Sequence, residues 1–171
     1  VDCHSDVKSA AHDTPPKHIT CATCHADPQA AYDRSFHAKA VLGGNDNAAR
    51  CVDCQGSPHE LLPASDPKSR FAHGNIPATC GTCHSQKFVM EKSGLSVQPV
   101  ASYQQSVHGH AVANGSEKAA VCTDCHESVE KGPVAGIPSV KTCMICHSQI
   151  ATDKALIKEV TAYSEKGVEI P

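Results

Sequence analysis

The chain has 171 residues and a formal net charge of −3, and it contains no Trp, 4% aromatic residues, 11 Cys and 12 His. Aromatic side chains supply much of the buried area of ordinary cores, so a conventional core is not expected. The weak negative charge excludes a basic nucleic-acid surface, and no apolar run reaches the roughly 18 to 20 residues of a membrane span. We therefore expect no nucleic-acid partner, no transmembrane segment, and a molecule organised by its Cys and His residues.

Most of the cysteines recur in one motif, in which two Cys are separated by two residues and followed by His. Complete copies occupy 21–25, 80–84, 122–126 and 143–147. The spacing is typical of covalently bound haem, because two thiols add to the vinyl groups on one porphyrin edge and the next imidazole binds the iron. A zinc ribbon needs no His after every second Cys, and regular CxxC pairs are not typical of a disulfide framework. These motifs therefore predict four haems with their iron.

Two further cysteine sites are irregular. Cys3 and His4 stand in the positions of the second Cys and the His of such a motif, which we interpret as truncated at its start. Cys51 and Cys54 are followed by Gln55 where the motif has His. With these two sites we expect six haems, while a lone thiol at Cys3 and a nonstandard or open site at Gln55 remain alternatives. The expected haem-binding cysteines are Cys3, Cys21, Cys24, Cys51, Cys54, Cys80, Cys83, Cys122, Cys125, Cys143 and Cys146.

One early helix is bracketed by Asp27 as N-cap, Pro28 at its first position and Gly43 past its end. It carries His37. The stretches 55–80 and 126–140 are rich in Pro, Gly and Ser and are predicted to be loops wrapped on haem. An apolar face formed by Ile150, Leu156, Ile157, Val160 and Tyr163 predicts a C-terminal helix that ends before Gly167.

An internal repeat organises this pattern. Tyr32, His37, Gly44 and Cys51 recur 71 residues later as Tyr103, His108, Gly115 and Cys122. An ungapped correspondence of this length indicates a repeated structural unit. We predict a single multihaem unit of three dihaem modules: 1–31, which is truncated at its start, 32–102 and 103–171.

The histidine count matches six haems with two axial histidines each. Proximal ligands are expected at His4, His25, His84, His126 and His147, and the other candidates are His12, His18, His37, His59, His73, His108 and His110. We expect His59 to take the proximal place beside Gln55, although any one of these histidines could instead be a surface or packing residue. Met90 is the only methionine outside a motif. Bis-His ligation at low potential is therefore expected, because Met ligation raises the potential.

With these motifs the chain resembles the multihaem c-type cytochromes of bacteria and archaea over essentially its whole length. The shared patterns are Tyr-x-x-Ser-x-His, CxDCH-Gly and Ile-Pro-x-Thr-Cys-x-x-Cys-His. The resemblance implies a mainly α fold with much irregular coil, little or no sheet, and haems packed in place of a core. It also implies a periplasmic or extracellular site and electron transfer to redox partner proteins or other cytochrome subunits.

Two other functions stay open. A reductase of a small nitrogen or sulfur oxyanion would use an open-site haem at Cys51 and Cys54. A subunit of an extracellular cytochrome filament, or of a membrane redox complex, would carry the same motifs in an oligomer. We expect an electron carrier with no catalytic residue of its own.

Overall fold

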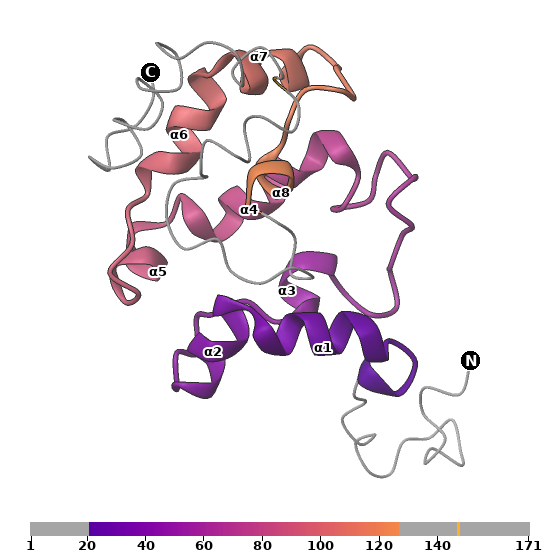
Figure 1. Ribbon diagram of the computed structural model, residues 1–171, viewed down its shortest axis with the longest axis vertical. Helices are drawn as coiled ribbons and strands as arrows, with labels where there is room; N and C mark the ends of the chain where they lie inside the picture. Colours follow the sequence, from indigo (N-terminus) through magenta and orange to yellow (C-terminus); the bar gives the residue numbers. More distant parts are fainter. Residues whose placement is uncertain (1–20, 127–146, 148–171) are drawn as a thin grey trace.

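A computed structural model describes residues 21–126 and residue 147 of the chain. These residues form short helices joined by turns and coil, and no strand occurs among them (Figure 1). The expectation of a mainly α fold with much coil is confirmed. In chain order the helices are η1 (Cys21–Thr23), α1 (Ala26–Arg34), α2 (Phe36–Leu42), α3 (Cys51–Gln55), η2 (His73–Asn75), α4 (Ile76–His84), α5 (Lys87–Glu91), α6 (Gln98–Gln105), α7 (Val107–Ala113) and α8 (Cys122–Cys125).

The helix expected as one piece after Asp27 is two helices, α1 and α2. Ser35 separates them, because its extended backbone (ψ 162°) ends α1 and its hydroxyl accepts the Ala38 N–H at 3.1 Å to cap α2. Serine favours this local hydrogen bond over continued helix. The N-cap of α1 is His25 rather than Asp27, which corrects the prediction, whereas Gly43 follows α2 as expected.

The helix pair α6 and α7 repeats the pair α1 and α2 (Figure 1). Ser106 is the counterpart of Ser35, and its hydroxyl accepts the Gly109 N–H at 3.1 Å. Both second helices end in the same way, with Gly44 at φ 84° and Gly115 at φ 86°. The left-handed glycine is typical of a Schellman C-cap, so the repeat extends to the helix ends.

The link from each helix pair to the following cysteine motif is also repeated. The hydroxyl of Tyr32 donates to the Ala49 carbonyl at 2.9 Å, and that of Tyr103 donates to the Ala120 carbonyl at 3.0 Å. The next residue is the N-cap of a cysteine helix, and its backbone N–H donates to the Asp of that helix, at 2.7 Å for Asp53 and 2.8 Å for Asp124. The tyrosine therefore ties each helix pair to the cysteine helix that follows it.

The stretch 55–80 is only partly the predicted loop. It runs as turns and coil as far as Ala72, then enters η2 and α4, so that Ile76 and Pro77 are helical. Proline is tolerated in the first helical turn because its missing N–H would have had no partner there. Apart from residue 126, the predicted loop 126–140 lies outside the described residues, as does the predicted C-terminal helix.

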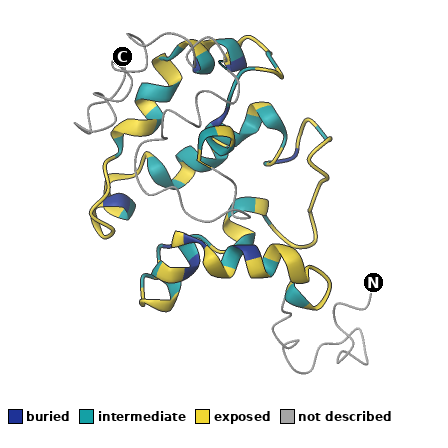
Figure 2. Ribbon diagram, viewed as in Figure 1, coloured by how far each residue is buried: buried dark blue, intermediate teal, exposed yellow. Residues whose placement is uncertain are grey.

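The described residues bury few large side chains. Their buried hydrophobic residues are Ala31, Ala38, Ala48, Met90, Val112 and Val121. Large apolar side chains remain exposed, including Leu42 and Val107 at 84% and Phe88 at 66% (Figure 2). No helix in this part of the chain is long and apolar enough to cross a membrane.

Candidate functional site

Each described cysteine motif lies in a helical turn. In α4, Cys80, Cys83 and His84 stand at positions i, i+3 and i+4, which share one face of a helix. The motifs at 21–25 and 122–126 each close a turn from the His N–H to the first Cys carbonyl, at 2.9 and 2.8 Å. Such a turn presents two thiols and one imidazole on the same side, the arrangement that a porphyrin edge and its iron require.

None of the eight described cysteines forms a disulfide. Two contacts join different motifs: the Cys51 side chain hydrogen-bonds that of Cys21, and the Cys80 side chain hydrogen-bonds that of Cys122. The second contact raises the pKa of Cys80 and lowers that of Cys122. Helix α4 also packs against α8 (Figure 1). Motifs that follow one another in the sequence therefore lie next to one another in space.

Two pairs of histidine rings lie close together. The ring centroids of His37 and His84 are 6.1 Å apart, with an angle of 66° between the ring planes. The ring centroids of His108 and His147 are 5.8 Å apart, with an angle of 38°. In both pairs a His on the helix after the capping Ser lies next to the His of the following TCxxCH motif.

The surroundings of the first pair favour the neutral imidazole. Burial lowers the pKa of His37. Burial also lowers the pKa of His84, and the nearby His37 and His126 act on it in the same direction. A neutral imidazole is the form that can bind a metal ion through a ring nitrogen. Burial therefore favours the form of both side chains that can act as a ligand.

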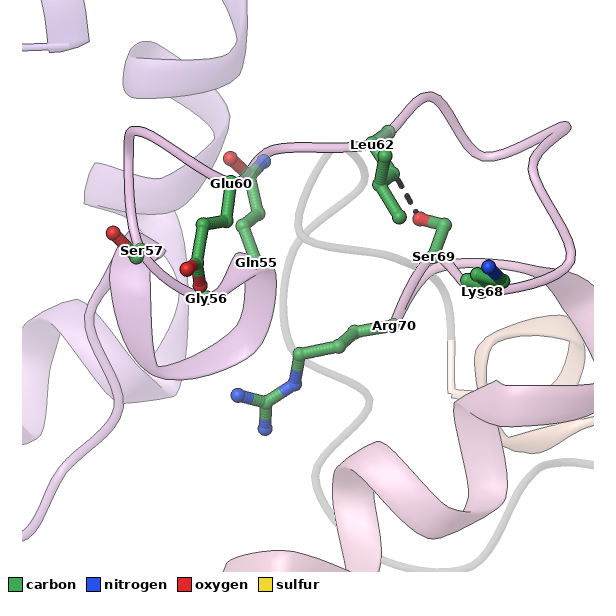
Figure 3. Close-up of a pocket in the computed structure, with 8 residues that line it drawn as sticks. All are labelled: Gln55, Gly56, Ser57, Glu60, Leu62, Lys68, Ser69 and Arg70. Carbon is green, nitrogen blue, oxygen red and sulfur yellow. Dashed lines mark hydrogen bonds between the residues drawn. The ribbon is translucent and has the colours of Figure 1, made fainter.

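The site at Gln55 is built differently. Gln55 ends α3, and Gly56 follows with φ 92°. An open pocket of about 310 Å³ lies beside them, lined by Gln55, Gly56, Ser57, Glu60, Leu62, Lys68, Ser69 and Arg70 (Figure 3). The aliphatic part of Arg70 lies against Gly56, where an added Cβ would meet Arg70 Cδ at 3.6 Å. Arg70 also acts on Cys54, whose pKa is raised chiefly by burial and lowered in part by the guanidinium charge.

Other candidate histidines among residues 21–126 include His25, His59 and His110, which are exposed. The Nε2 atom of His73 lies 2.9 Å from the Ala119 carbonyl oxygen, close to the start of α8. The candidates Cys3, His4, His12, His18, Cys143 and Cys146 lie outside the described residues.

Sequence reasoning identified every member of the two histidine pairs but left their pairing open. The available signal was the order of motifs within each repeat, because a Ser-x-His segment precedes a TCxxCH or closely similar motif in both. Sequence reasoning also missed the hydrogen-bonding role of Tyr32 and Tyr103, although the repeat marked both residues. The pocket beside Gln55 had no signal, since residues 55–70 show no periodic pattern.

Within residues 21–126 and 147, no group of three or more His, Cys, Asp or Glu side chains is arranged to hold a bare metal ion. Comparison with protein-family models, with curated proteins and with solved structures found no match to this chain.

Proposed function

We propose that this chain is a multihaem c-type cytochrome that transfers electrons along a row of covalently bound, mostly bis-His, low-potential haems. The observation that carries the proposal is the combination of repeated CxxCH turns with two histidine pairs whose rings lie 6.1 and 5.8 Å apart. Exposed apolar residues such as Leu42 and Val107 support it, because porphyrin faces would cover surface that the protein leaves bare.

In this proposal the cysteines attach the haems and the histidines bind their iron. The thiols of each CxxC pair would hold one haem edge, and the following His would bind the iron from one side. Haem iron supplies the one-electron redox step, while the protein sets spacing, ligation and solvent access. The contacts between Cys21 and Cys51, and between Cys80 and Cys122, support close haem neighbours along the row.

The proposed number of haems is six, including those at Cys3 and at Cys51 with Cys54. The proposed location is periplasmic or extracellular, because covalent haem attachment takes place outside the cytoplasmic membrane in the cytochromes that this chain resembles. The proposed partners are redox proteins or further cytochrome subunits.

The intact mass of the denatured chain, produced with a c-type maturation system, tests the proposal. Each motif that holds haem should add one covalently bound haem mass. The double variant Cys80→Ala with Cys83→Ala should lose one haem and leave the others in place. A chain that carries no covalent haem, with its thiols free or bound to another metal, would contradict the proposal.

The pocket beside Gln55 favours a second candidate function, reduction of a small nitrogen or sulfur oxyanion. Lys68 and Arg70 give the pocket two cationic side chains against the single carboxylate of Glu60, which suits a small anion. An open-site haem on Cys51 and Cys54 should then bind carbon monoxide, and Gln55→His should abolish this binding by supplying a ligand. A fully low-spin protein that binds no carbon monoxide would rule out this candidate.

A further inference from the structure

We infer that His37 and His84 are the two axial ligands of the haem on Cys80 and Cys83, and that His108 and His147 are those of the haem on Cys143 and Cys146. The inference rests on the proposed function and assigns distal partners to two of its haems. It follows from the positions of four imidazoles. The helix after each capping serine, α2 or α7, would then supply the distal ligand of a haem in its own module.

The ring separations fit ligation of one ion from opposite sides. Two imidazoles that each bind through one nitrogen at about 2.0–2.1 Å have ring centroids roughly 6 Å apart. The two pairs lie at 6.1 and 5.8 Å. The ring planes differ by 66° in one pair and 38° in the other, which ligation permits because each ring can rotate about its bond to the iron.

Direct packing of two aromatic rings would also give centroids about 4.5–7 Å apart, so distance alone does not decide the matter. The deciding observation is that the contact occurs twice between equivalent positions. His37 and His108 are related by the repeat, and their partners His84 and His147 both end a CxxCH motif. Incidental ring packing gives no reason for the same two motif positions to meet in both modules.

The protein fixes the distal histidines firmly. His37 and His108 are the second residues of α2 and α7, two positions after the capping serines. The tyrosines of the preceding helices anchor each pair to the next cysteine helix at 2.9 and 3.0 Å. A distal ligand held in this way needs little reorganisation when haem is attached.

Lys39 provides a control on α2. It lies two residues after His37, so it projects from a different side of the helix, and it is exposed. Its counterpart in the other repeat is His110, which stays a candidate ligand for one of the other proposed haems. Lys39 is not a candidate ligand, so its replacement should leave every haem ligated.

The test compares three variants of the mature holoprotein: His108→Ala, His37→Ala and Lys39→Ala. The first two should each convert one haem per chain from low-spin to high-spin, as seen by electron paramagnetic resonance. Each should also gain one carbon monoxide site when reduced. Added imidazole should restore the low-spin signal, because it fills the vacated position, and this rescue shows that the variant has folded. Lys39→Ala should retain the wild-type spectrum.

A second set of variants, in which one haem attachment site is removed first, identifies which haem each distal histidine binds. In a chain with Cys143→Ala and Cys146→Ala, intact mass should show the loss of one haem. There, adding His108→Ala should create no new high-spin haem, while adding His37→Ala should still create one. The reciprocal background, with Cys80→Ala and Cys83→Ala, should reverse these two results.

The outcomes separate the inference from the proposed function. A protein with full covalent haem that stays low-spin in His108→Ala, or becomes equally high-spin in Lys39→Ala, would overturn the pairing alone. A protein without covalent haem would overturn the proposed function and the pairing together.

Discussion

The two histidine pairs hold the proposed axial ligands of two haems, and the first pair differs from ordinary surface histidines. His37 and His84 are shielded enough for burial to lower the pKa of both. Neutral nitrogen ligands on both sides of an iron, without a Met ligand, are typical of low potential. The side chain at the distal position should therefore control the potential of one haem.

Replacement of a distal histidine by methionine tests this at the residue scale. His108→Met should raise the potential of one haem, because Met/His ligation raises the potential, within the roughly 0.8 V span that axial ligation covers. A spectroelectrochemical titration would resolve the shifted component. Ala113→Met, at an exposed position of the same helix, is the control and should leave the titration unchanged. An unshifted titration of His108→Met, with full haem content, would contradict the assignment.

The repeated tyrosines allow a second residue-scale prediction. Tyr103→Phe removes the hydroxyl that donates to the Ala120 carbonyl at 3.0 Å, and it should lower the free energy of unfolding by about 0.5–1.5 kcal/mol. Tyr32→Phe removes the equivalent bond at 2.9 Å and should cost a similar amount. Denaturant unfolding of the holoproteins would measure both. If neither variant is destabilised, the proposed role of the tyrosines is wrong.

At the scale of elements, the two helix pairs have the same caps but differ in how closely their helices meet. In the pair α6 and α7, a Cβ added at Gly109 would collide with the Tyr103 carbonyl oxygen and lie 2.9 Å from Gln104 Cα. The equivalent position in the other repeat is Ala38, which is buried at 3% exposure. The second pair therefore needs glycine where the first accommodates a methyl group.

Gly109→Ala should accordingly be destabilising, by about 1–3 kcal/mol, because the new methyl group overpacks the helix junction. Helix propensity alone predicts the opposite sign, since Ala is favoured over Gly in a helix interior by roughly 1 kcal/mol. Thermal unfolding of the holoprotein decides between the two. Ala38→Gly is the matched change and should cost about 1 kcal/mol. A stabilised Gly109→Ala protein would show that the junction relaxes freely.

The element scale also shows what the sequence could predict. The repeat and the CxxCH turns follow from motif spacing, which acts locally, whereas the mainly α class was what the family resemblance implied. The break at Ser35 was missed because helix-favouring residues continue on both sides, while the serine hydroxyl offers a competing cap. The early start of α4 was missed because Pro77 was taken as a loop signal, although proline suits a first helical turn. Pairing of His37 with His84 depends on packing between elements, which no local pattern encodes.

At the scale of the molecule, residues 21–126 lack the large apolar interior that would normally hold such short helices together. Beyond Met90, the buried hydrophobic residues among them are three Ala and two Val. Isolated helices shorter than about 12 residues are marginal in water, and every described helix is shorter than that. In the proposed holoprotein, porphyrin rings would supply the missing apolar contacts and the covalent bonds would join the elements.

Folding should therefore depend on haem. Expression without the c-type maturation system gives the same chain with free thiols, and this apoprotein should show weak helical circular dichroism and no cooperative thermal transition. The mature protein should unfold cooperatively, because attachment, ligation and burial would be coupled to the fold as in other sites where ligand binding contributes folding free energy. Reductant in both samples removes disulfides as a cause of any difference. A haem-free chain that melts cooperatively, with helix content equal to that of the mature protein, would mean that side-chain packing alone holds the fold, and haem would then be bound to an already stable scaffold.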